Sequence, residues 1–513
     1  MTVIDGGNET SYNVRRMNTV HSMKRRTFIR LAAAMPLFSI GNAALAGTVA
    51  DGRKIRLGLI GCGGRMGLST RYGILNNMCT EEIVCIAEPD PSRWDKVRAV
   101  VKAHQPQTDV TKIRAFYDYR EMLDKMSGEL DAVAIATPNH HHASAAILAM
   151  SKGLHVYVEK PMALTVEEVG LMHAAAKKYG VVTQVGNHGH SEEGMRRLVE
   201  YIQSGAIGQV REVWAFNDRL NSMMYRPPKA EPPKGMDWDA WCGPAPVCDY
   251  YAPTADHNGL HPHDWHSWIG YGNGAIGNMG THILDPVFWA LRLGEVNPTS
   301  VEATDLKWGA EGSWTWRNTI HWEFPARKGM DAMTLHWFDG VKDGIPYDKE
   351  HVNRIGVCLK RDYQNLPPII EELEKKYGQN LGCLGTVYIG EKGVMAIGPH
   401  GGGLQFVPNK LQKALPKPPK TIPREKGMSH PVDWLRAIRN PNRPAGCNFD
   451  YSAPLARTVL LGNVAARAGL KKLAWDGTRI TNDEAANAFL RTTYRKGWEL
   501  KGDPTISNHQ GDT

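Results

Sequence analysis

The stretch that decides the fold runs from Asp131 to Glu168: DAVAIATPNHHHASAAILAMSKGLHVYVEKPMALTVEE. Its first apolar run, Ala132 to Ala136, is short and contains no polar residue, which is typical of a strand buried on both faces of a parallel sheet. The alanine-rich residues from Ala143 to Lys152 predict a helix that ends at Gly153, and His155 to Val158 predicts a second strand. Two parallel strands joined by a crossover helix are the unit of an α/β sheet, so the sequence predicts this fold class.

Polar residues follow each of these two strands. Thr137-Pro138-Asn139 follows the first strand, and Glu159-Lys160-Pro161 follows the second. Because open α/β sheets bind ligands at the carboxyl ends of their strands, we expect both turns to lie at a binding site. Thr165 to Glu168 then matches a capping box that opens another helix.

A glycine-rich turn stands earlier in the chain, after a predicted strand from Lys54 to Ile60. The turn runs Gly61-Cys-Gly-Gly-Arg-Met-Gly67, and its glycines allow backbone N–H groups and the start of a following helix to approach a pyrophosphate. Met66 replaces the third glycine of the GxGxxG pattern, so the match is partial. The second predicted strand ends at Glu88, where an acidic residue is expected to bond the ribose hydroxyls of NAD. We therefore expect NAD rather than NADP, although Arg93 nearby keeps NADP as an alternative.

The composition limits what else the chain can be. With 513 residues, of which 42% are hydrophobic, it is long enough for roughly two or three domains. The formal net charge is +8, and half of it lies in the first 46 residues, so no nucleic-acid groove is indicated. The 15 Trp and 20 His residues suit carbohydrate-like ligands as well as cores. The eight cysteines form no CxxC pair, and Cys242 with Cys248 is a candidate disulfide in an oxidising compartment.

Residues 1–46 are predicted to be an export signal rather than part of the fold. Lys24 to Arg30 is the basic segment KRRTFIR, Leu31 to Ile40 is too short to cross a bilayer, and Ala44-Leu-Ala46 matches a small-x-small cleavage site. This resembles a twin-arginine signal, with Met23 as an alternative start. An accidental basic and apolar leader, or an uncleaved anchor, is the alternative.

The export signal predicts a periplasmic or otherwise exported protein that meets the twin-arginine machinery. Because that machinery carries folded proteins, we expect the dinucleotide to be inserted before export and to be bound tightly. No later segment is apolar for long enough to span a membrane, so stable membrane insertion is not expected.

Four motifs in this order resemble the Gfo/Idh/MocA oxidoreductase family: the glycine turn, Thr137 to His142, Glu159-Lys-Pro161, and a glycine-rich turn that leads to His282. The resemblance implies an N-terminal Rossmann domain and a C-terminal α/β domain with a large open, mostly antiparallel sheet. That sheet would cover the nicotinamide on one face and make homo-oligomer contacts on the other. The expected domains are 54–187 and 188–500, followed by a tail at 501–513, with helices near 430–440 and 452–470 docking back on the first domain.

The chemistry is expected in the segment from Gly272 to Asp285. The resemblance gives His282 as the base and Lys160 as the residue that polarises the reacting oxygen, and Asp285 is expected to orient the imidazole. Asn278 is predicted as the N-cap of the helix, with residues 278, 282 and 285 on one face. Many family members have Asp where this chain has Asn278, and an amide cannot take a proton, which puts a two-group relay in doubt.

The patterns and the resemblance together predict the cofactor-binding residues Gly61, Gly63, Gly64, Arg65, Met66, Glu88, Thr137, Pro138, Asn139, His142, Glu159, Lys160 and Asn187. The predicted substrate-binding residues are His188, Trp265, Asn278 and His282. The segment from Arg226 to Pro262 is expected to be a binding loop over the cleft or a surface insertion packed by its own aromatic residues. The histidines at 257, 261, 263 and 266 raise a metal hypothesis, but they match no metal template, so no metal is assigned.

Three functions remain open. The first is an exported NAD-dependent dehydrogenase that acts on a secondary hydroxyl of a sugar, glycoside or cyclitol. The second is a redox-neutral glycosidase that oxidises its substrate transiently and eliminates the aglycone. The third is a sugar-binding protein without turnover.

Overall fold

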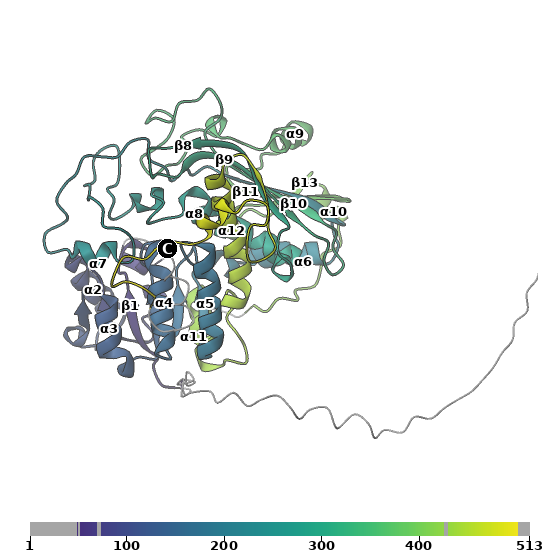
Figure 1. Cartoon of the computed structure of the whole chain (residues 1–513). Coiled ribbons are helices and arrows are strands. Elements are labelled where there is room, and N and C mark those ends of the chain that lie inside the picture. The colour runs from purple at the N-terminus through teal and green to yellow at the C-terminus, as the bar shows by residue number, and fades with distance from the viewer. Residues whose placement is uncertain (1–48, 50–51, 69–72, 425–428, 501–513) are drawn as a thin grey trace, which may run out of the picture. The chain divides into compact units, whose positions relative to one another are not determined.

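The computed structural model describes residues 49, 52–68, 73–424 and 429–500, so the predicted export signal and the tail 501–513 lie outside the described residues. The described chain builds two sheets, and the helices α8 (Gly274–Leu291) and α12 (Phe449–Ala468) lie between them (Figure 1). Helix α12 packs on both halves, because it contacts α5 (Val166–Tyr179) of the first and β8 (Ser300–Trp308) of the second.

The first sheet is parallel and has the strand order β3-β2-β1-β4-β5-β6. Its strands are β1 (Arg56–Ile60), β2 (Glu82–Ala87), β3 (Arg114–Phe116), β4 (Ala132–Ile135), β5 (His155–Val158) and β6 (Thr183–Val185). The chain changes direction across the sheet between β1 and β4, and a crevice forms at such a point in doubly wound sheets. The predicted Rossmann architecture is confirmed.

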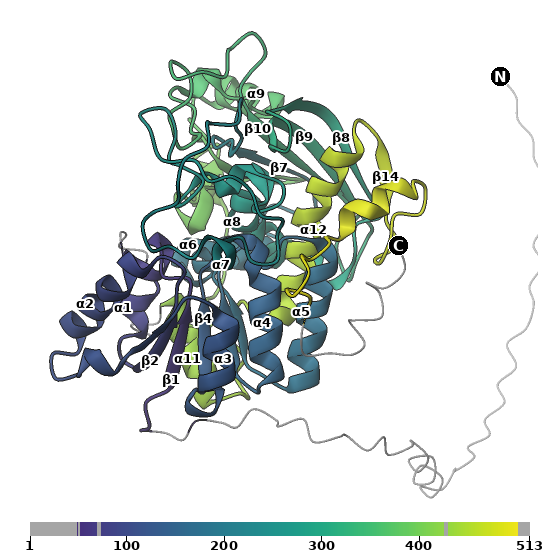
Figure 2. The same ribbon diagram turned by 60° about the vertical axis from the view of Figure 1, so that its left-hand side comes forward.

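Helices cover both faces of this sheet (Figure 2). They are α1 (Leu75–Met78), α2 (Trp94–His104), α3 (Tyr119–Met126), α4 (His142–Ser151), α5 and, from the far end of the chain, α11 (His430–Arg439). Trp434 of α11 is buried against the ring of Tyr157, so this C-terminal helix packs on the first sheet. The predicted capping box is present, because Glu168 N donates to Thr165 Oγ1 at 3.3 Å and Thr165 N donates to Glu168 Oε2 at 2.9 Å.

The second sheet has the order β13-β12-β11-β7-β10-β9-β8-β14 and is antiparallel except at β7–β10. Its other strands are β7 (Val210–Asn217), β9 (Thr315–Phe324), β10 (Met333–Gly340), β11 (Gly385–Gly390), β12 (Gly393–Ile397), β13 (Gln405–Val407) and β14 (Lys472–Ala474). Trp322 of β9 is fully buried against Gly462 of α12, where a side chain would lie 2.7 Å from the indole. This close approach holds α12 against the sheet.

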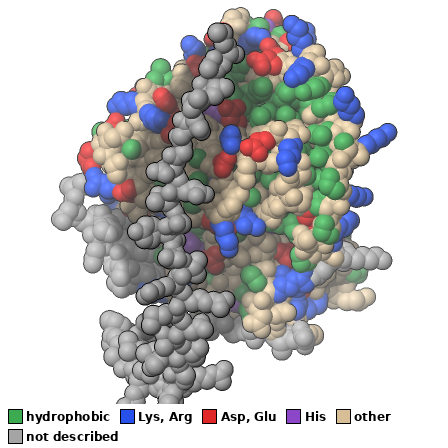
Figure 3. Space-filling model, turned by 90° about the vertical axis from the view of Figure 1, so that its right-hand side faces the viewer, with side chains coloured by type: hydrophobic (Ala, Val, Ile, Leu, Met, Phe, Trp, Pro, Cys, Tyr) green, Lys and Arg blue, Asp and Glu red, His purple; other side chains and the backbone are tan. Residues whose placement is uncertain are grey.

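The opposite face of the second sheet is only partly covered. Helix α9 (Pro368–Tyr377) packs Ile370 and Leu373 against Phe216 and Phe338 of that face. Hydrophobic side chains gather on the upper part of the molecule when it is viewed from the side that carries β10 and β13 (Figure 3). Part of the predicted open face is therefore closed by α9.

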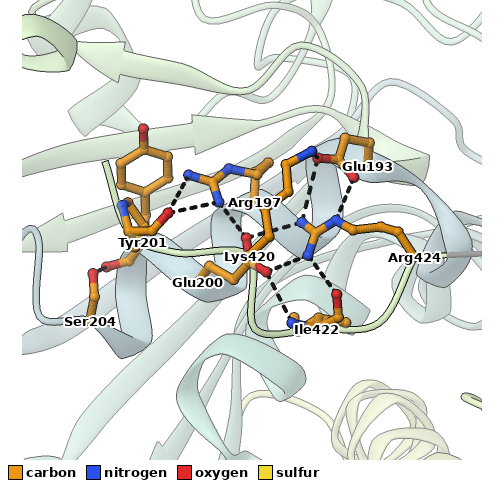
Figure 4. Close-up of polar contacts among 9 residues, drawn as sticks. Glu193, Arg197, Glu200, Tyr201, Ser204, Lys420, Ile422 and Arg424 are labelled. Carbon is orange, nitrogen blue, oxygen red and sulfur yellow. Dashed lines mark hydrogen bonds and ion pairs between the residues drawn. The ribbon is translucent and has the colours of Figure 1, made fainter. Parts of the chain in front are cut away.

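The segment after the short helix α10 (Leu411–Ala414) is fastened to α6 (Glu193–Gln203) by ion pairs (Figure 4). Arg424 pairs with Glu193 at 2.8 Å and also with Glu200. Glu200 is only 4% exposed and pairs with Arg197 as well, at 2.5 Å. Two guanidinium groups thus compensate one buried carboxylate.

The segment from Arg226 to Pro262 contains one short helix, α7 (Trp238–Cys242), within the described chain. Trp241 stacks on Trp238 and on Tyr271, which belong to an aromatic cluster of this region. The cluster also faces the first domain, so the segment is both packed by its own aromatic residues and placed over a cavity. Among the described residues, no helix is long and apolar enough to span a bilayer.

Candidate active site

A cavity of about 450 Å³ lies at the carboxyl ends of β1 and β4, under the segment 240–266. The predicted cofactor residues in its wall are Gly61, Gly63, Gly64, Arg65, Glu88, Thr137 and Pro138. Trp265, a predicted substrate residue, lines it too and stacks on His266 with the ring centres 3.6 Å apart. The two strand ends meet here because β1 and β4 are neighbours in the sheet.

The close contact between Gly61 and Thr137 shapes the cavity wall so that a dinucleotide can lie against it. Gly61 has φ +77°, and a side chain there would lie 2.7 Å from Thr137 N, so only glycine allows this approach. Thr137 Oγ1 is buried and bonds to no residue in the described ranges. A bare backbone wall beside an unpaired hydroxyl suits the pyrophosphate of a dinucleotide. The helix expected after the turn is a short π-helical segment, Gly64–Leu68, and residues 69–72 lie outside the description.

Glu88 fixes the glycine turn from the second strand. Its carboxylate accepts from Cys62 N at 2.6 Å and from Asp90 N at 3.0 Å, and it lines the cavity. Arg93, the residue that kept NADP open, is held by Asp90 at 3.2 Å and by His261 at 2.9 Å. A carboxylate has about four acceptor positions, so Glu88 has acceptor capacity left for ribose hydroxyls.

Six residues predicted to bind the cofactor are not in the wall of this cavity: Met66, Asn139, His142, Glu159, Lys160 and Asn187. Met66 is fully buried in the core of the first domain. Asn139 donates to Asn273 Oδ1 at 2.6 Å, and the His142 ring lies between two backbone carbonyl groups at 2.8 and 3.0 Å. His141, which the sequence analysis did not select, lines the cavity. Because the turn after β4 is tight, the residue that faces the cavity is His141 and not His142.

Lys160 is held by the helix that follows the second glycine-rich turn. Its Nζ donates to Asn278 Oδ1 at 2.6 Å, and Asn278 Nδ2 donates to Asn221 Oδ1 at 2.9 Å. Burial lowers the pKa of Lys160 to about 8, although the charge of Glu159 acts in the opposite direction. Glu159 is itself paired with Arg65 at 2.8 Å, so it compensates Lys160 only in part.

Asn278 does not cap its helix, contrary to the prediction. Helix α8 begins at Gly274 with Asn273 at the N-cap position, so Asn278 lies in the second turn. It acts instead as the acceptor for Lys160. The glycine-rich sequence before it obscures the start of the helix, because glycine is a poor helix former.

His282 is oriented by an amide. Asn187 Nδ2 donates to the Thr281 carbonyl at 3.3 Å, which turns Asn187 Oδ1 toward His282 Nδ1 at 2.8 Å. Since that oxygen can only accept, the hydrogen-bond pattern assigns the proton to Nδ1 and leaves the Nε2 lone pair free. Burial and then the charge of neighbouring groups, Lys160 among them, lower the pKa of His282 well below its usual value. The hydrogen-bond pattern thus presents Nε2 as the ring nitrogen that can accept a proton, and burial disfavours the charged form of the ring.

The expectation that Asp285 orients the His282 imidazole is wrong. Asp285 is fully buried and bonds to His190 Nδ1 at 3.0 Å and to the Tyr451 hydroxyl group. The segment from Asn187 to His190 runs beside α8, so Asn187 meets residue 282 and His190 meets residue 285. Asp285 therefore holds the segment from Asn187 to His190 in place, and the hydrogen-bond partner of the His282 imidazole is the neutral amide of Asn187.

Two more imidazoles stand next to His282. The ring of His400 is 4.2 Å from that of His282 and is stacked on His188 at 4.4 Å. His188 was predicted as a substrate residue, but no local pattern selected His400, which comes from the turn Pro399–Gly401 between β12 and β13. Burial and the charges of nearby cations lower the pKa of His400 to about 4.

The three ring nitrogens lie within 4.8 Å of one another and have the spacing of a metal site. Arg65 Nη2, however, lies 3.1 Å from His188 Nδ1 and donates to it, which leaves a hydrogen on the other ring nitrogen. Arg65 and Lys160 also surround the cluster with positive charge. A cation is therefore disfavoured at these three histidines.

The four histidines from 257 to 266 do not form a metal-binding group in the described chain. His257 and His263 lie beside Asp264, at 3.8 and 3.2 Å, whereas His261 bonds to Arg93 and Trp241. His263 lines both the first cavity and an adjoining one of about 740 Å³. The cluster thus lies between two neighbouring cavities.

The comparison with known families agrees with this architecture. The family model described as "Oxidoreductase family, NAD-binding Rossmann fold" matches residues 55–187, and "Oxidoreductase family, C-terminal alpha/beta domain" matches residues 211–374. Together they cover more than half of the chain.

The chain belongs to the Gfo/Idh/MocA oxidoreductase family. Levoglucosan dehydrogenase of Pseudarthrobacter phenanthrenivorans is 28% identical over 37% of this chain and 41% of its own. Glycosyl hydrolase family 109 protein 1 of a Shewanella species is 25% identical over 37% of this chain and 45% of its own. The chain thus spans less than half the length of these two relatives. A solved structure, that of an inositol dehydrogenase homologue of Azotobacter vinelandii with NADH and myo-inositol, has a TM-score of 0.51 at 14% identity, and the match covers 83% of this chain and 98% of that one. It shows the shared fold.

Proposed function

We propose that the protein is an exported NAD-dependent oxidoreductase that oxidises a secondary hydroxyl group of a sugar, glycoside or cyclitol. The observation that carries the proposal is that helix α8 serves both functional groups. Its Asn278 accepts the hydrogen bond from Lys160, and its His282 follows one helical turn later. Asn278 thus links the helix that carries the oriented imidazole to the amine that follows β5 of the NAD-binding domain, and neither group is in the wall of the cavity at the glycine turn. An amine and an imidazole are the pair of groups that oxidation of an alcohol requires.

A bound NAD would be held by the glycine turn, Glu88 and Thr137, and its nicotinamide would supply the acceptor for the hydride of the carbinol carbon. His282 accepts the hydroxyl proton at Nε2, and the imidazolium that forms is stabilised through Nδ1 by Asn187 Oδ1. Lys160 donates to the same oxygen and stabilises its developing negative charge. Asn278 takes no proton in this scheme; it holds the amine in place.

A second candidate is the redox-neutral glycosidase. Oxidation beside a glycosidic bond acidifies the neighbouring C–H group, and elimination then requires another base. His400 lies next to His282 and offers an imidazole for that step, whereas Nδ1 of His188 already accepts from Arg65. The similarity to a glycosyl hydrolase family 109 protein and the adjoining cavity of about 740 Å³, which has room for an aglycone, support this candidate.

The setting of the enzyme is part of the proposal. We infer export by the twin-arginine route with a tightly held NAD, NADP being the less suited cofactor. We also infer a homo-oligomer formed through the face of the second sheet that α9 leaves uncovered, where His336 stacks on Trp214 at 3.8 Å. Neither nucleic acid nor a stable membrane insertion belongs to this scheme. Sedimentation of the purified protein tests the oligomer.

One experiment separates the candidates. The exported protein is purified, any bound dinucleotide is released and identified, and the absorbance of reduced nicotinamide is followed while sugars and glycosides are added. Lasting reduction supports the dehydrogenase, and release of aglycone without net reduction supports the glycosidase. No dinucleotide, or no change in either assay, refutes both.

A further inference from the structure

We propose that the substrate carries a carboxylate group and that Arg219 is the residue that binds it. The proposal rests on the function proposed above and narrows its substrate class to sugar acids, such as uronic acids and their glycosides. Arg219 follows β7 of the second domain and lines the same cavity as the glycine turn. It lies near enough to His266, which lines the same cavity, for its charge to act on that ring.

The backbone around Arg219 is held on two sides. Arg219 forms a bridge with Val357, and Leu220 N donates to the Gly356 carbonyl at 2.8 Å. Two residues further on, Asn221 accepts from Asn278, the residue that holds Lys160. The backbone that carries Arg219 is thus fixed close to the residues that hold Lys160.

Within the described part of the chain the Arg219 side chain makes no hydrogen bond or ion pair, and its charge acts only through space on the carboxylate of the adjacent Asp218. The charge of Asp218 also raises the pKa of Cys358 and Cys383. Asp218 and Arg219 are therefore expected to point to opposite faces, as successive side chains of an extended strand do. The arginine is exposed, so its fork is available to a ligand.

The field in this part of the site is positive. Besides burial, the charges that lower the pKa of Lys160 are Arg65 and Arg219, and Glu159 alone opposes them. His266 also has its pKa lowered by burial first and then by cationic neighbours, Arg219 among them. Because Arg65 is paired with Glu159 and Lys160 serves the reacting oxygen, Arg219 is the cation left for a substrate anion.

A carboxylate fits this arrangement better than a neutral hydroxyl group does. The planar guanidinium forms two parallel hydrogen bonds to a carboxylate, and such charged bonds are stronger than neutral ones. A bound anion would also compensate the positive field around the histidines. Neutral sugars would leave Arg219 unpaired in the wall of the cavity.

The test uses the holoprotein and matched pairs of probes: methyl glycosides of hexoses and of the corresponding uronic acids, with hexose 6-phosphates as a third arm. Binding is measured by calorimetry, and turnover by reduction of the dinucleotide. The variants are Arg219→Gln, Arg219→Lys and, as a control that removes the same charge from the loop bridged to this strand, Arg354→Gln.

We expect the native protein to bind a uronate at least about 10-fold more tightly than its neutral partner, the usual gain from a charged hydrogen bond. Arg219→Gln removes this preference and lowers kcat/KM for the uronate by about 10- to 100-fold, whereas Arg219→Lys retains part of it and Arg354→Gln all of it. Equal losses for both members of a pair, a preference for the phosphate, or absence of uronate binding in the native protein overturns the proposal. Loss of dinucleotide in Arg219→Gln would assign the guanidinium to the cofactor instead. Uronate binding with the expected preference but without reduction keeps this inference and refutes the proposed function.

Discussion

Replacing Asn278 by Asp tests how the site controls its catalytic amine. The change places a carboxylate oxygen where Asn278 Oδ1 now accepts from Lys160 Nζ at 2.6 Å. Asn221, which accepts from the Asn278 amide, can turn its own amide to donate to the new oxygen, so the hydrogen-bond network is conserved. The charge next to Lys160 is then the property that changes.

The magnitude follows from the distance. Two unit charges 2.6 Å apart attract by about 6 kcal/mol at an effective dielectric constant near 20, which is the upper limit because burial of the second charge opposes it. Opposite charges at close range shift a pKa by about 1–3 units, so we expect the pKa of Lys160 to rise from about 8 to roughly 9–11. At pH 9 the native amine is about 10% protonated, whereas an amine with a pKa of 10 is about 90% protonated.

The assay does not require the substrate. Only the uncharged amine reacts with an acylating reagent, so the pH dependence of Lys160 acylation, followed by peptide mass spectrometry, gives its pKa. Asn278→Leu is the matched control, because it removes the acceptor without adding charge and should leave the pKa at or below about 8. Once a substrate is known, the alkaline limb of kcat should move to higher pH in Asn278→Asp by the same amount. An unchanged midpoint in Asn278→Asp would refute the assignment of Lys160 as an amine controlled by this position.

Three further predictions concern the site and its support. Lys160→Ala and His282→Ala each lower turnover by at least about 100-fold but retain the dinucleotide, measured after its release from the purified protein; undiminished rates in both would show that the active centre lies elsewhere. Asn187→Leu removes the acceptor of His282 Nδ1 and lowers kcat by about 10-fold or more, with less effect on KM; a native rate would mean that the tautomer is set by another group. Glu200→Ala destabilises the protein by about 3 kcal/mol, because it leaves two guanidinium groups without their buried carboxylate. In the same denaturation experiment the control Glu193→Ala, which changes a half-exposed partner, costs less than about 1 kcal/mol.

Much of the first domain could be predicted because its signals are local. The apolar run before Thr137, the alanine-rich helix and the capping box each depend on residues close together in the chain, and the structure has all three. The glycine turn and Glu88 were found for the same reason. The register of the turn after β4 was missed, where His141 rather than His142 lines the cavity, and so was the position of Met66, which lies in the core.

The surroundings of His282 could not be predicted, because they depend on contacts between distant segments. A helix carries side chains on all sides, and the spacing of residues 282 and 285 did not reveal which neighbouring segment each would meet. Asn187 was assigned to the cofactor, yet it is the partner of His282. His400 and Arg219 stand alone in loops at strand ends, and only the order of the strands in the second sheet brings them to the site.

The amide at position 278 and the unpaired side chain of Arg219 have a common physical consequence. With Asp at position 278, Lys160 would have an internal counterion, and a substrate anion would add negative charge to a site that was already balanced. With Asn278, the amine has only a neutral acceptor, and its pKa near 8 reflects the burial that this acceptor does not offset. A substrate carboxylate at Arg219 would then supply the missing negative charge, although at a different point of the cavity. Binding of the correct substrate would thereby favour the ammonium form of Lys160, the form that stabilises the developing alkoxide, so that recognition and activation would depend on the same charge.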